Sequence, residues 1–359
     1  MLSPGFVSDC GRAAAELTDS TPLLEVQDLS VEFLTREGAV QALNGVSFSV
    51  RRGEVLALLG ESGSGKSVTL RAILGLNPGR RARVLGSVRL AGKDVNALSN
   101  RGRAEMRGAV AAMIFQEPLT ALDPVYTVGR QIVETILRHR PLDREAAQRR
   151  ARELLDMVQV PSPERCLGAY PHEISGGMRQ RAMIAIALAG EPALLLADEP
   201  TTALDVTVQA QILWLLRDLQ QRLGLAVIFV THDLGVAAEI ADEAAVMYAG
   251  RIVERAPIAE LFARPAHPYT EGLMRATVRR GQKGRPLIPI PGAPPDLRRL
   301  PAGCAFTPRC PLAREECLAR LPVLIAVGPG HAARCHLVPE RFGPPASPVP
   351  ALHSQHAQP

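Results

Sequence analysis

The segment from Gly60 to Ser67, which reads GESGSGKS, restricts the fold of this chain more than any other segment. It follows the apolar run Val55–Leu59 and precedes a helix-like segment, Val68–Leu74. The pattern G-x-x-x-x-G-K-S between a strand and a helix is typical of a loop that binds phosphates. Its glycines allow backbone N–H groups to converge on an anion, and the helix N-terminus adds positive potential. The sequence therefore predicts an α/β protein with a nucleotide site.

Two side chains of this loop suit a magnesium nucleotide. Lys66 is expected to reach the β- and γ-phosphates, and the Ser67 hydroxyl is expected to bind Mg²⁺, a cation that prefers oxygen ligands. A chance Gly/Ser-rich turn is the alternative, and the strand before it and the helix after it argue against that reading. The predicted nucleotide-binding residues of the segment are Gly60, Ser62, Gly63, Gly65, Lys66, Ser67 and Val68.

Length and composition narrow the class of protein. The chain has 359 residues, 47% of them hydrophobic, which is enough for a sizeable core. No apolar run approaches the ~20 residues that cross a bilayer. Met1–Pro22 lacks the basic and apolar regions of a secretory signal, so a cytosolic location is expected. The basic segment 263–342 fits an ordinary solvated surface as well as an acidic partner, anionic lipid or nucleic acid.

Groups suited to bind a nucleotide follow four apolar, strand-like runs of the sequence. In open α/β sheets, ligands bind beyond the carboxyl ends of the strands, so these groups are expected to converge on one nucleotide. Asp198 is expected to hold Mg²⁺ directly or through water, and Glu199 to act as the general base on the attacking water. His232 is expected to hydrogen-bond the γ-phosphate, although a single histidine after a strand is more often an ordinary loop residue. The groups that follow the four runs are Gly60, Gln116, Asp198 with Glu199, and His232.

Periodicity predicts the remaining elements. Leu24–Phe33 and Ala39–Val50 read as strands, and Gly86–Val95 reads as a hairpin around Ala91 and Gly92. Between Glu117 and Gly190 apolar residues recur at helical spacing, which predicts an inserted helical unit.

A second glycine-rich turn, Ile174–Gln180, opens one of these helices and predicts a second anion site. With two phosphate-binding turns, the chain closely resembles the nucleotide-binding subunit of ABC transporters over about residues 23–262. The resemblance implies a RecA-like P-loop NTPase fold with an antiparallel β subdomain and an inserted helical subdomain at about residues 117–190. It also implies a site composed of the Mg²⁺ ligands Ser67, Gln116 and Asp198, the signature residues Ser175, Gly176, Gly177 and Gln180, the D-loop Asp205, the switch residue His232, and Phe33, which stacks on adenine.

The same resemblance implies that two cassettes face each other head to tail, with each ATP between one P-loop and the signature turn of the other. Because the chain carries one cassette, it must pair with a copy of itself or with a related cassette. ATP binding closes the pair, and hydrolysis releases it. Membrane subunits that dock near Gln116 and the helical unit convert this cycle into transport.

Segments after residue 262 resemble the C-terminal extension of oligopeptide and dipeptide importer ATPases, at His267–Thr270, Ile290–Pro295, Pro301–Phe306 and Arg309–Pro311. Met178 resembles the D-type member of a non-identical pair. The resemblance implies a heterodimer with an F-type cassette, two permease subunits and an extracytoplasmic solute-binding protein, at the cytoplasmic face of the membrane. The cargo stays open, with nickel or another small solute as the alternative to peptides.

Other functional classes fit less well. A DNA-repair cassette ATPase is disfavoured by the short stretch between Gln116 and Ser175, which leaves no room for a coiled-coil insertion. Translational cassettes usually carry two P-loops per chain, and the second glycine-rich turn disfavours a P-loop kinase. No nucleic-acid partner is therefore expected.

Four late cysteines, Cys304, Cys310, Cys317 and Cys335, could supply thiolate ligands. Four such ligands suit Zn²⁺ or an iron–sulfur cluster. No C-x2-4-C turn typical of zinc knuckles is present, and the wider spacing resembles the [4Fe-4S] site of some peptide-importer ATPases. A [4Fe-4S] cluster is therefore expected, with Zn²⁺ or buried unliganded thiols as alternatives. The expected domains are a disordered lead at 1–22, the cassette at 23–262, the extension at 263–342 and a disordered tail at 343–359.

Overall fold

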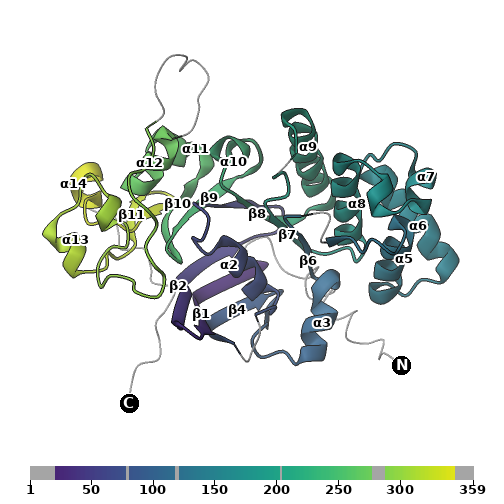
Figure 1. The fold of residues 1–359 in the computed structure, drawn as a ribbon, viewed down its shortest axis with the longest axis horizontal. Helices are drawn as coiled ribbons and strands as arrows, with labels where there is room; N and C mark the ends of the chain where they lie inside the picture. Colours follow the sequence, from purple (N-terminus) through teal and green to yellow (C-terminus); the bar gives the residue numbers. More distant parts are fainter. Residues whose placement is uncertain (1–20, 78–80, 118–120, 203, 277–287, 344–359) are drawn as a thin grey trace. The chain divides into compact units, whose positions relative to one another are not determined.

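The computed structural model describes residues 21–77, 81–117, 121–202, 204–276 and 288–343 (Figure 1). The predicted N-terminal lead and C-terminal tail lie almost entirely outside the described residues. The chain forms two compact units. Among the described residues, the first unit contains those within 21–25, 49–55 and 89–230, and the second contains those within 26–48, 56–88 and 231–343.

Three parallel strands form the centre of the first unit. They are β6 (Ala111–Ile114), β7 (Leu194–Asp198) and β8 (Ala226–Thr231). Ala111 pairs with Leu194, and Leu194 pairs with Ala226. Every residue of β7 and β8 is buried, as expected for apolar strands covered on both faces. The apolar runs of the sequence therefore predicted these strands correctly, and parallel pairing brings the carboxyl ends of β6 and β7 to the same edge.

Packed helices of the first unit, drawn in teal in Figure 1, lie in the part of the chain where the sequence predicts an inserted helical unit. Helices α5 and α6 pack on each other, and both pack on α7 and α8. Among its described residues, the helices of the first unit are α3 (Asn100–Ala109), α5 (Val128–His139), α6 (Arg144–Met157), α7 (Pro163–Gly168), η1 (Pro171–Glu173), α8 (Gly176–Leu188) and α9 (Val206–Leu223).

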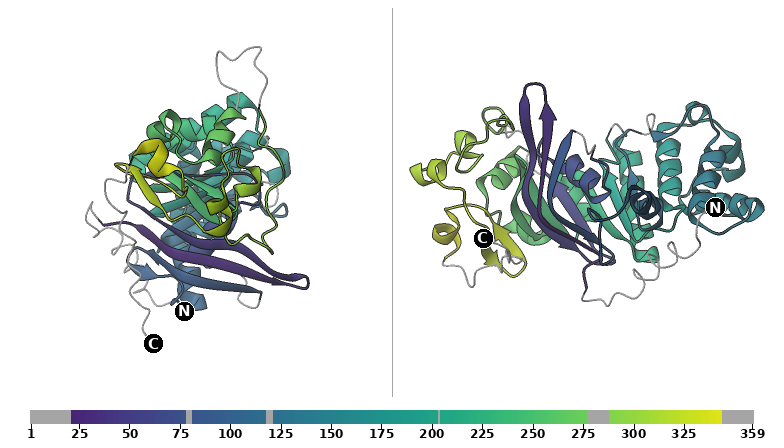
Figure 2. Two further views of the ribbon diagram at one scale, coloured as in Figure 1. Left: turned by 90° about the vertical axis from the view of Figure 1, so that its left-hand side faces the viewer. Right: turned by 90° about the horizontal axis from the view of Figure 1, so that it is seen from below.

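In the second unit, β1 (Leu24–Thr35) and β2 (Gly38–Val50) form a long hairpin, which Figure 2 shows side by side. Only two residues join them, so they run antiparallel. Strand β4 (Ala82–Leu90) is the other neighbour of β1. The end of β4 (Arg89 and Leu90), whose residues are counted with the first unit, pairs with β5 (Lys93–Asp94) through a turn in which Ala91 and Gly92 have φ of 48° and 76°. The predicted hairpin is confirmed.

Another group of paired strands begins with β3 (Val55–Leu59), which leads into the P-loop and α2 (Lys66–Ile73). Strand β3 runs parallel to β9 (Glu243–Tyr248), and β9 pairs antiparallel with β10 (Arg251–Pro257). Strand β10 continues antiparallel to β12 (His331–Ala333), and β12 to β11 (Ile325–Gly328). Helices α10 (Leu234–Ile240) and α11 (Ile258–Ala263) complete this part.

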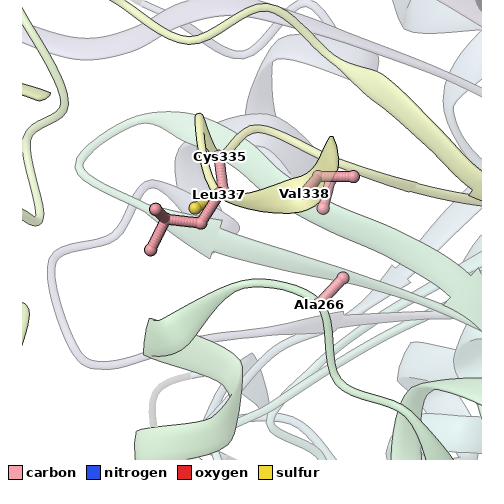
Figure 3. Close-up of a cluster of buried hydrophobic side chains, with 5 residues drawn as sticks. Ala266, Cys335, Leu337 and Val338 are labelled. Atoms are coloured by element: carbon pink, nitrogen blue, oxygen red, sulfur yellow. The ribbon is translucent and has the colours of Figure 1, made fainter. Parts of the chain in front are cut away.

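The described residues after Ala263, which we term the C-terminal segment (264–276 and 288–343), contain four short helices. These are α12 (Pro268–Arg275), η2 (Thr307–Arg309), α13 (Glu315–Ala319) and α14 (Val338–Phe342). A small apolar core lies within this segment, with the Cys335 sulfur beside Leu337 (Figure 3). It contains Ala266, Ala333, Cys335, Leu337 and Val338.

Among the described residues, no helix combines the length and the apolar character needed to cross a membrane.

Candidate nucleotide site

The backbone of the P-loop admits only glycine at two positions. Gly60 and Gly65 have φ of 149° and 106°, values that side-chain-bearing residues rarely adopt. A Cβ atom on Gly60 would lie 2.3 Å from the Met247 carbonyl oxygen, and one on Gly65 would lie 2.7 Å from Leu43. The loop is therefore packed against β2 and β9 so closely that its curvature depends on both glycines.

Lys66 lies at the start of α2 and is buried, with its ammonium inside the curve of the loop. Its Nζ donates hydrogen bonds to the carbonyl oxygens of Gly60 (2.7 Å) and Glu61 (2.9 Å). The Ser64 hydroxyl is buried and has no hydrogen-bond partner among the described residues. A buried cation, an unpartnered hydroxyl and a helix N-terminus without acidic residues fit an anionic ligand such as a triphosphate.

The first unit brings Gln116 and Glu199 together beyond β6 and β7. Gln116 Nε2 donates to Glu199 Oε2 over 3.2 Å, and the Thr202 hydroxyl donates to the same oxygen over 3.0 Å. Glu199 has φ of 45°, a left-handed conformation that costs free energy for a residue with a side chain. Its N–H donates to the Val230 carbonyl oxygen over 3.1 Å. The carboxylate is thus held in one orientation by two donors and by its own backbone.

Asp198 ends β7 and is buried. In the second unit, Ser67 is half-buried in the first turn of α2. A carboxylate and a hydroxyl are oxygen donors of the kind that Mg²⁺ prefers, so the chemistry of these residues fits that cation.

The signature turn opens α8, as the sequence predicts. The Ser175 side chain is the N-cap and accepts a hydrogen bond from the Met178 N–H over 3.3 Å. Ser175 and Gly176 are exposed, Gly177 is half-buried, and Gln180 is buried one turn further along. An exposed helix N-terminus with small residues leaves its N–H groups accessible to an anion.

The other predicted residues have the following positions. Asp205 is exposed and caps α9 by accepting from the Val208 N–H over 3.0 Å. His232 is exposed immediately after β8, and Phe33 is half-buried on β1. Of the predicted residues, Gln116, Ser175, Gly176, Gly177, Gln180, Asp198, Glu199 and Asp205 belong to the first unit, and Phe33, the P-loop residues, His232 and the four late cysteines belong to the second.

The prediction of an iron–sulfur or zinc site is wrong. Cys304, Cys310, Cys317 and Cys335 do line one cavity, but it measures about 20 Å³, room for one water molecule. Among the described residues, no group of three or more histidine, cysteine or acidic side chains is arranged to hold a metal ion. The sequence spacing correctly predicted that the four thiols lie together, but it could not reveal the size of the space between them.

The four thiols around this cavity are half-buried (Cys304 and Cys310) or buried (Cys317 and Cys335). Burial raises the pKa of the Cys304 and Cys310 thiols above their usual value. It raises the pKa of Cys335 to about 11. These three side chains are therefore neutral thiols near pH 7.

Sequence reasoning missed two side chains that contact the P-loop from the C-terminal segment. The Tyr269 hydroxyl accepts a hydrogen bond from the Glu61 N–H over 2.8 Å. Arg309 forms a two-bond ion pair with the Glu61 carboxylate, at 2.7 and 2.9 Å. The available signals were the His-Pro-Tyr and Arg-Cys-Pro segments, but neither indicates a partner 208 or 248 positions away.

Comparison with known proteins places this geometry in a family. A family model described as ABC transporter matches residues 43–202, and one described as the C-terminal region of oligopeptide/dipeptide transporters matches residues 253–317. A probable peptide ABC transporter ATP-binding protein of Sinorhizobium fredii is 54% identical over 316 residues, which are 87% of this chain and 94% of that protein.

Two further proteins are similar over less of their length or at lower identity. The oligopeptide transport ATP-binding protein OppD of Mycobacterium bovis is 51% identical over 317 residues. The match covers 88% of this chain but only about half (52%) of OppD. The dimeric ATP-binding cassette MJ0796, solved in a post-hydrolysis state with ADP and Pi, is 28% identical with a TM-score of 0.59, over 66% of this chain and 98% of that one. The P-loop, the Gln116–Glu199 pair and these similarities lead to one conclusion: the chain belongs to the ATP-binding proteins of ABC transporters, in the peptide-transporter family.

Proposed function

We propose that this chain binds and hydrolyses ATP to drive the import of oligopeptides or dipeptides through a multi-subunit ABC transporter. The observation that carries this proposal is the P-loop, with Lys66 buried in its curve, in a chain 54% identical to a probable peptide ABC transporter ATP-binding protein. Both family matches agree with it, since one is a transporter cassette and the other is the C-terminal region of peptide transporters. Nickel as cargo has less support, because the relatives compared above are described as peptide transporters.

ATP binding is assigned to the P-loop residues Gly60, Ser62, Gly63, Gly65, Lys66, Ser67 and Val68. The buried Lys66 ammonium would exchange its carbonyl partners for phosphate oxygens, and the adenine would stack on Phe33. Ser67, Asp198 and Gln116 would hold Mg²⁺, which neutralises phosphate charge when bound.

Hydrolysis is assigned to Glu199, Gln116 and His232. The Glu199 carboxylate would accept the proton of the attacking water while that water's oxygen bonds to the γ-phosphorus and the bond to the bridging oxygen breaks. Thr202 and Gln116 donate to one oxygen of Glu199, and this fixes the orientation of the base. His232 would donate to the γ-phosphate and report its presence.

A second cassette would complete the site, because the exposed Ser175 turn and Asp205 have no role within a single P-loop. Ser175, Gly176 and Gly177 would contact the γ-phosphate bound by the partner cassette, whereas Gln180, the remaining residue assigned to the signature turn, is buried. The dimeric MJ0796 cassette supports such pairing. We propose an F-type ATPase as the partner, two permease subunits that hold the pair at the cytoplasmic face of the membrane, and an extracytoplasmic solute-binding protein.

The proposed domains are the cassette at 23–262, with its helical subdomain at about 117–190, and the C-terminal extension at 263–342. The lead at 1–22 and the tail at 343–359 stay predictions.

Purification from the native host tests this proposal. Tagged full-length chain, extracted from membranes in mild detergent, should bring two permease subunits and a second cassette, identified by mass spectrometry. The purified complex should hydrolyse ATP, and a Lys66→Ala complex should not. Recovery of the chain with DNA or ribosomes and without permeases would move its function outside transport.

A further inference from the structure

All three polar groups of Glu61, the second residue of the P-loop, have partners in the second unit. Its N–H donates to the Tyr269 hydroxyl (2.8 Å), and its carboxylate accepts two bonds from Arg309 (2.7 and 2.9 Å). Its carbonyl oxygen accepts from Lys66 Nζ (2.9 Å). Glu61 therefore connects the phosphate-binding lysine with the C-terminal segment through one residue.

Arg309 is fixed from every side. Its Nε donates to the Pro291 carbonyl oxygen (2.9 Å), and its Nη1 also donates to the Tyr248 hydroxyl (3.3 Å). Its guanidinium lies 6.0 Å from the Phe306 ring centre, and 4% of its side chain is exposed. A planar group with this many placed donors sets the direction of the Glu61 carboxylate, which a lysine could not do.

Tyr269 is also positioned by its surroundings. Its N–H donates to Nδ1 of His267, the N-cap of α12 (3.0 Å). Its ring packs 4.6 Å from that of Tyr248 and 5.4 Å from that of Phe306. Burial raises the pKa of Tyr269, so the hydroxyl stays neutral while it accepts the Glu61 N–H. The segments His267–Thr270 and Arg309–Pro311 thus converge on one P-loop residue, and Pro291 of Ile290–Pro295 holds Arg309 in place.

We infer that the C-terminal segment tunes the nucleotide affinity of the P-loop by holding Glu61, with Arg309 and Tyr269 as positioning residues. An unpaired carboxylate within a phosphate-binding loop repels a triphosphate, and Arg309 cancels that charge and holds the carboxylate in place. Tyr269 holds the backbone of the same residue, whose carbonyl contacts Lys66. The inference rests on the proposed ATP site.

ATP titration of the full-length chain tests it. Arg309→Gln should raise the Kd for Mg-ATP about tenfold, within the range typical of coupling between neighbouring sites. Tyr269→Phe, which removes one neutral acceptor, should raise it about threefold. Arg314→Gln is the matched control, since Arg314 makes a two-bond pair with Glu340 in the same segment and, in the described structure, does not contact the P-loop. Its Kd should equal that of the wild type.

A second variant separates charge from structure. Adding Glu61→Gln to Arg309→Gln removes the repelling carboxylate, so the Kd should return to within about threefold of the wild type. Circular dichroism establishes that each variant is folded. If Arg309→Gln does not fold, Arg309→Lys replaces it. Lysine keeps the positive charge but cannot form two parallel hydrogen bonds to the Glu61 carboxylate, so the Kd for Mg-ATP should rise about threefold.

Two results would overturn the inference and leave the proposed function intact. One is wild-type affinity in Arg309→Gln, or in Arg309→Lys where that variant replaces it, while Lys66→Ala has lost binding. The other is a double variant as weak as Arg309→Gln alone. A wild-type chain that binds no ATP would overturn the inference together with the proposed function.

Discussion

Gln116 and Glu199 are hydrogen-bonded at the edge of the parallel strands of the first unit, Nε2 to Oε2 over 3.2 Å, although 83 positions separate them in the chain. The amide donates to a carboxylate that also accepts from Thr202 and whose residue has the left-handed φ of 45°. A strained residue with a fixed side chain is a common property of reactive sites. The arrangement suits a general base whose orientation depends on its neighbours.

Glu199→Gln should bind Mg-ATP with wild-type affinity and hydrolyse it about 10²–10⁴-fold more slowly, the usual contribution of a positioned general base. The substitution keeps the size of the side chain and removes its basicity. Single-turnover hydrolysis by the tagged complex measures the effect. A rate within a factor of three of the wild type would assign the base to another residue.

Gln116→Ala should lower kcat about tenfold, because the amide orients the base and one charge-assisted hydrogen bond is worth about 1.5–3 kcal/mol. It should also raise KM for Mg-ATP, because Gln116 is one of the residues assigned to hold Mg²⁺. Gln148→Ala is the control, since Gln148 is exposed on α6. Steady-state ATPase assays of both variants give the two constants. Equal activity in the Gln116 and Gln148 variants would remove any positioning role from Gln116.

Gly65→Ala should lower the free energy of unfolding by about 2–4 kcal/mol, from strain at positive φ and from a Cβ in contact with Leu43. It should also abolish ATP binding, because the loop must open to relieve the contact. Gly168→Ala is the matched control for this substitution, since a Cβ atom at Gly168 would meet nothing within 4 Å. Urea unfolding compares the two, and similar stabilities would show that the loop tolerates a side chain.

Acid should destabilise the second unit through His267. Burial lowers the pKa of His267 to about 4, despite the nearby Glu254, while Arg341 acts in the same direction as burial. The unfolded chain therefore binds this proton first, so the stabilisation is complete above about pH 6.5 and is lost as pH falls toward 4. Protonation of His267 lowers the free energy of unfolding by up to about 3 kcal/mol.

The control for this prediction is His267→Asn, which keeps an N-cap acceptor for α12 and cannot gain a proton. Its free energy of unfolding should change less than that of the wild type between pH 6.5 and 4, as measured by urea titration at each pH. The exposed His172→Asn should retain the full wild-type slope. Parallel slopes in the His267 variant and the wild type would assign the acid response to other groups.

The sequence carried most of the information on the strands and the signature helix, because these depend on local pattern. Fully apolar runs became β7 and β8, and Ser175 before two glycines became the N-cap of α8. The P-loop was equally predictable, since its conformation depends on glycines at fixed offsets.

Contacts that depend on the packing of distant segments could not be predicted. The Arg309–Glu61 pair joins positions 248 residues apart, and nothing local to either residue indicates the other. The error at the cysteines is of the opposite kind. The sequence correctly predicted that the four thiols lie together, but it wrongly predicted that they bind a metal. Ligation depends on the space and the polarity between the thiols, and a cavity of about 20 Å³ has room for water but not for a cluster.

Peptide uptake by reconstituted transporter tests the proposed function most directly. The complex purified through this chain is placed in liposomes with its solute-binding protein outside and Mg-ATP inside, and entry of a radiolabelled oligopeptide is followed. Wild-type complex should accumulate peptide only with ATP, whereas Glu199→Gln complex should bind ATP and accumulate none. Peptide entry at the same rate without ATP, or with Glu199→Gln, would contradict the assignment of ATP hydrolysis at this chain as the energy source for import.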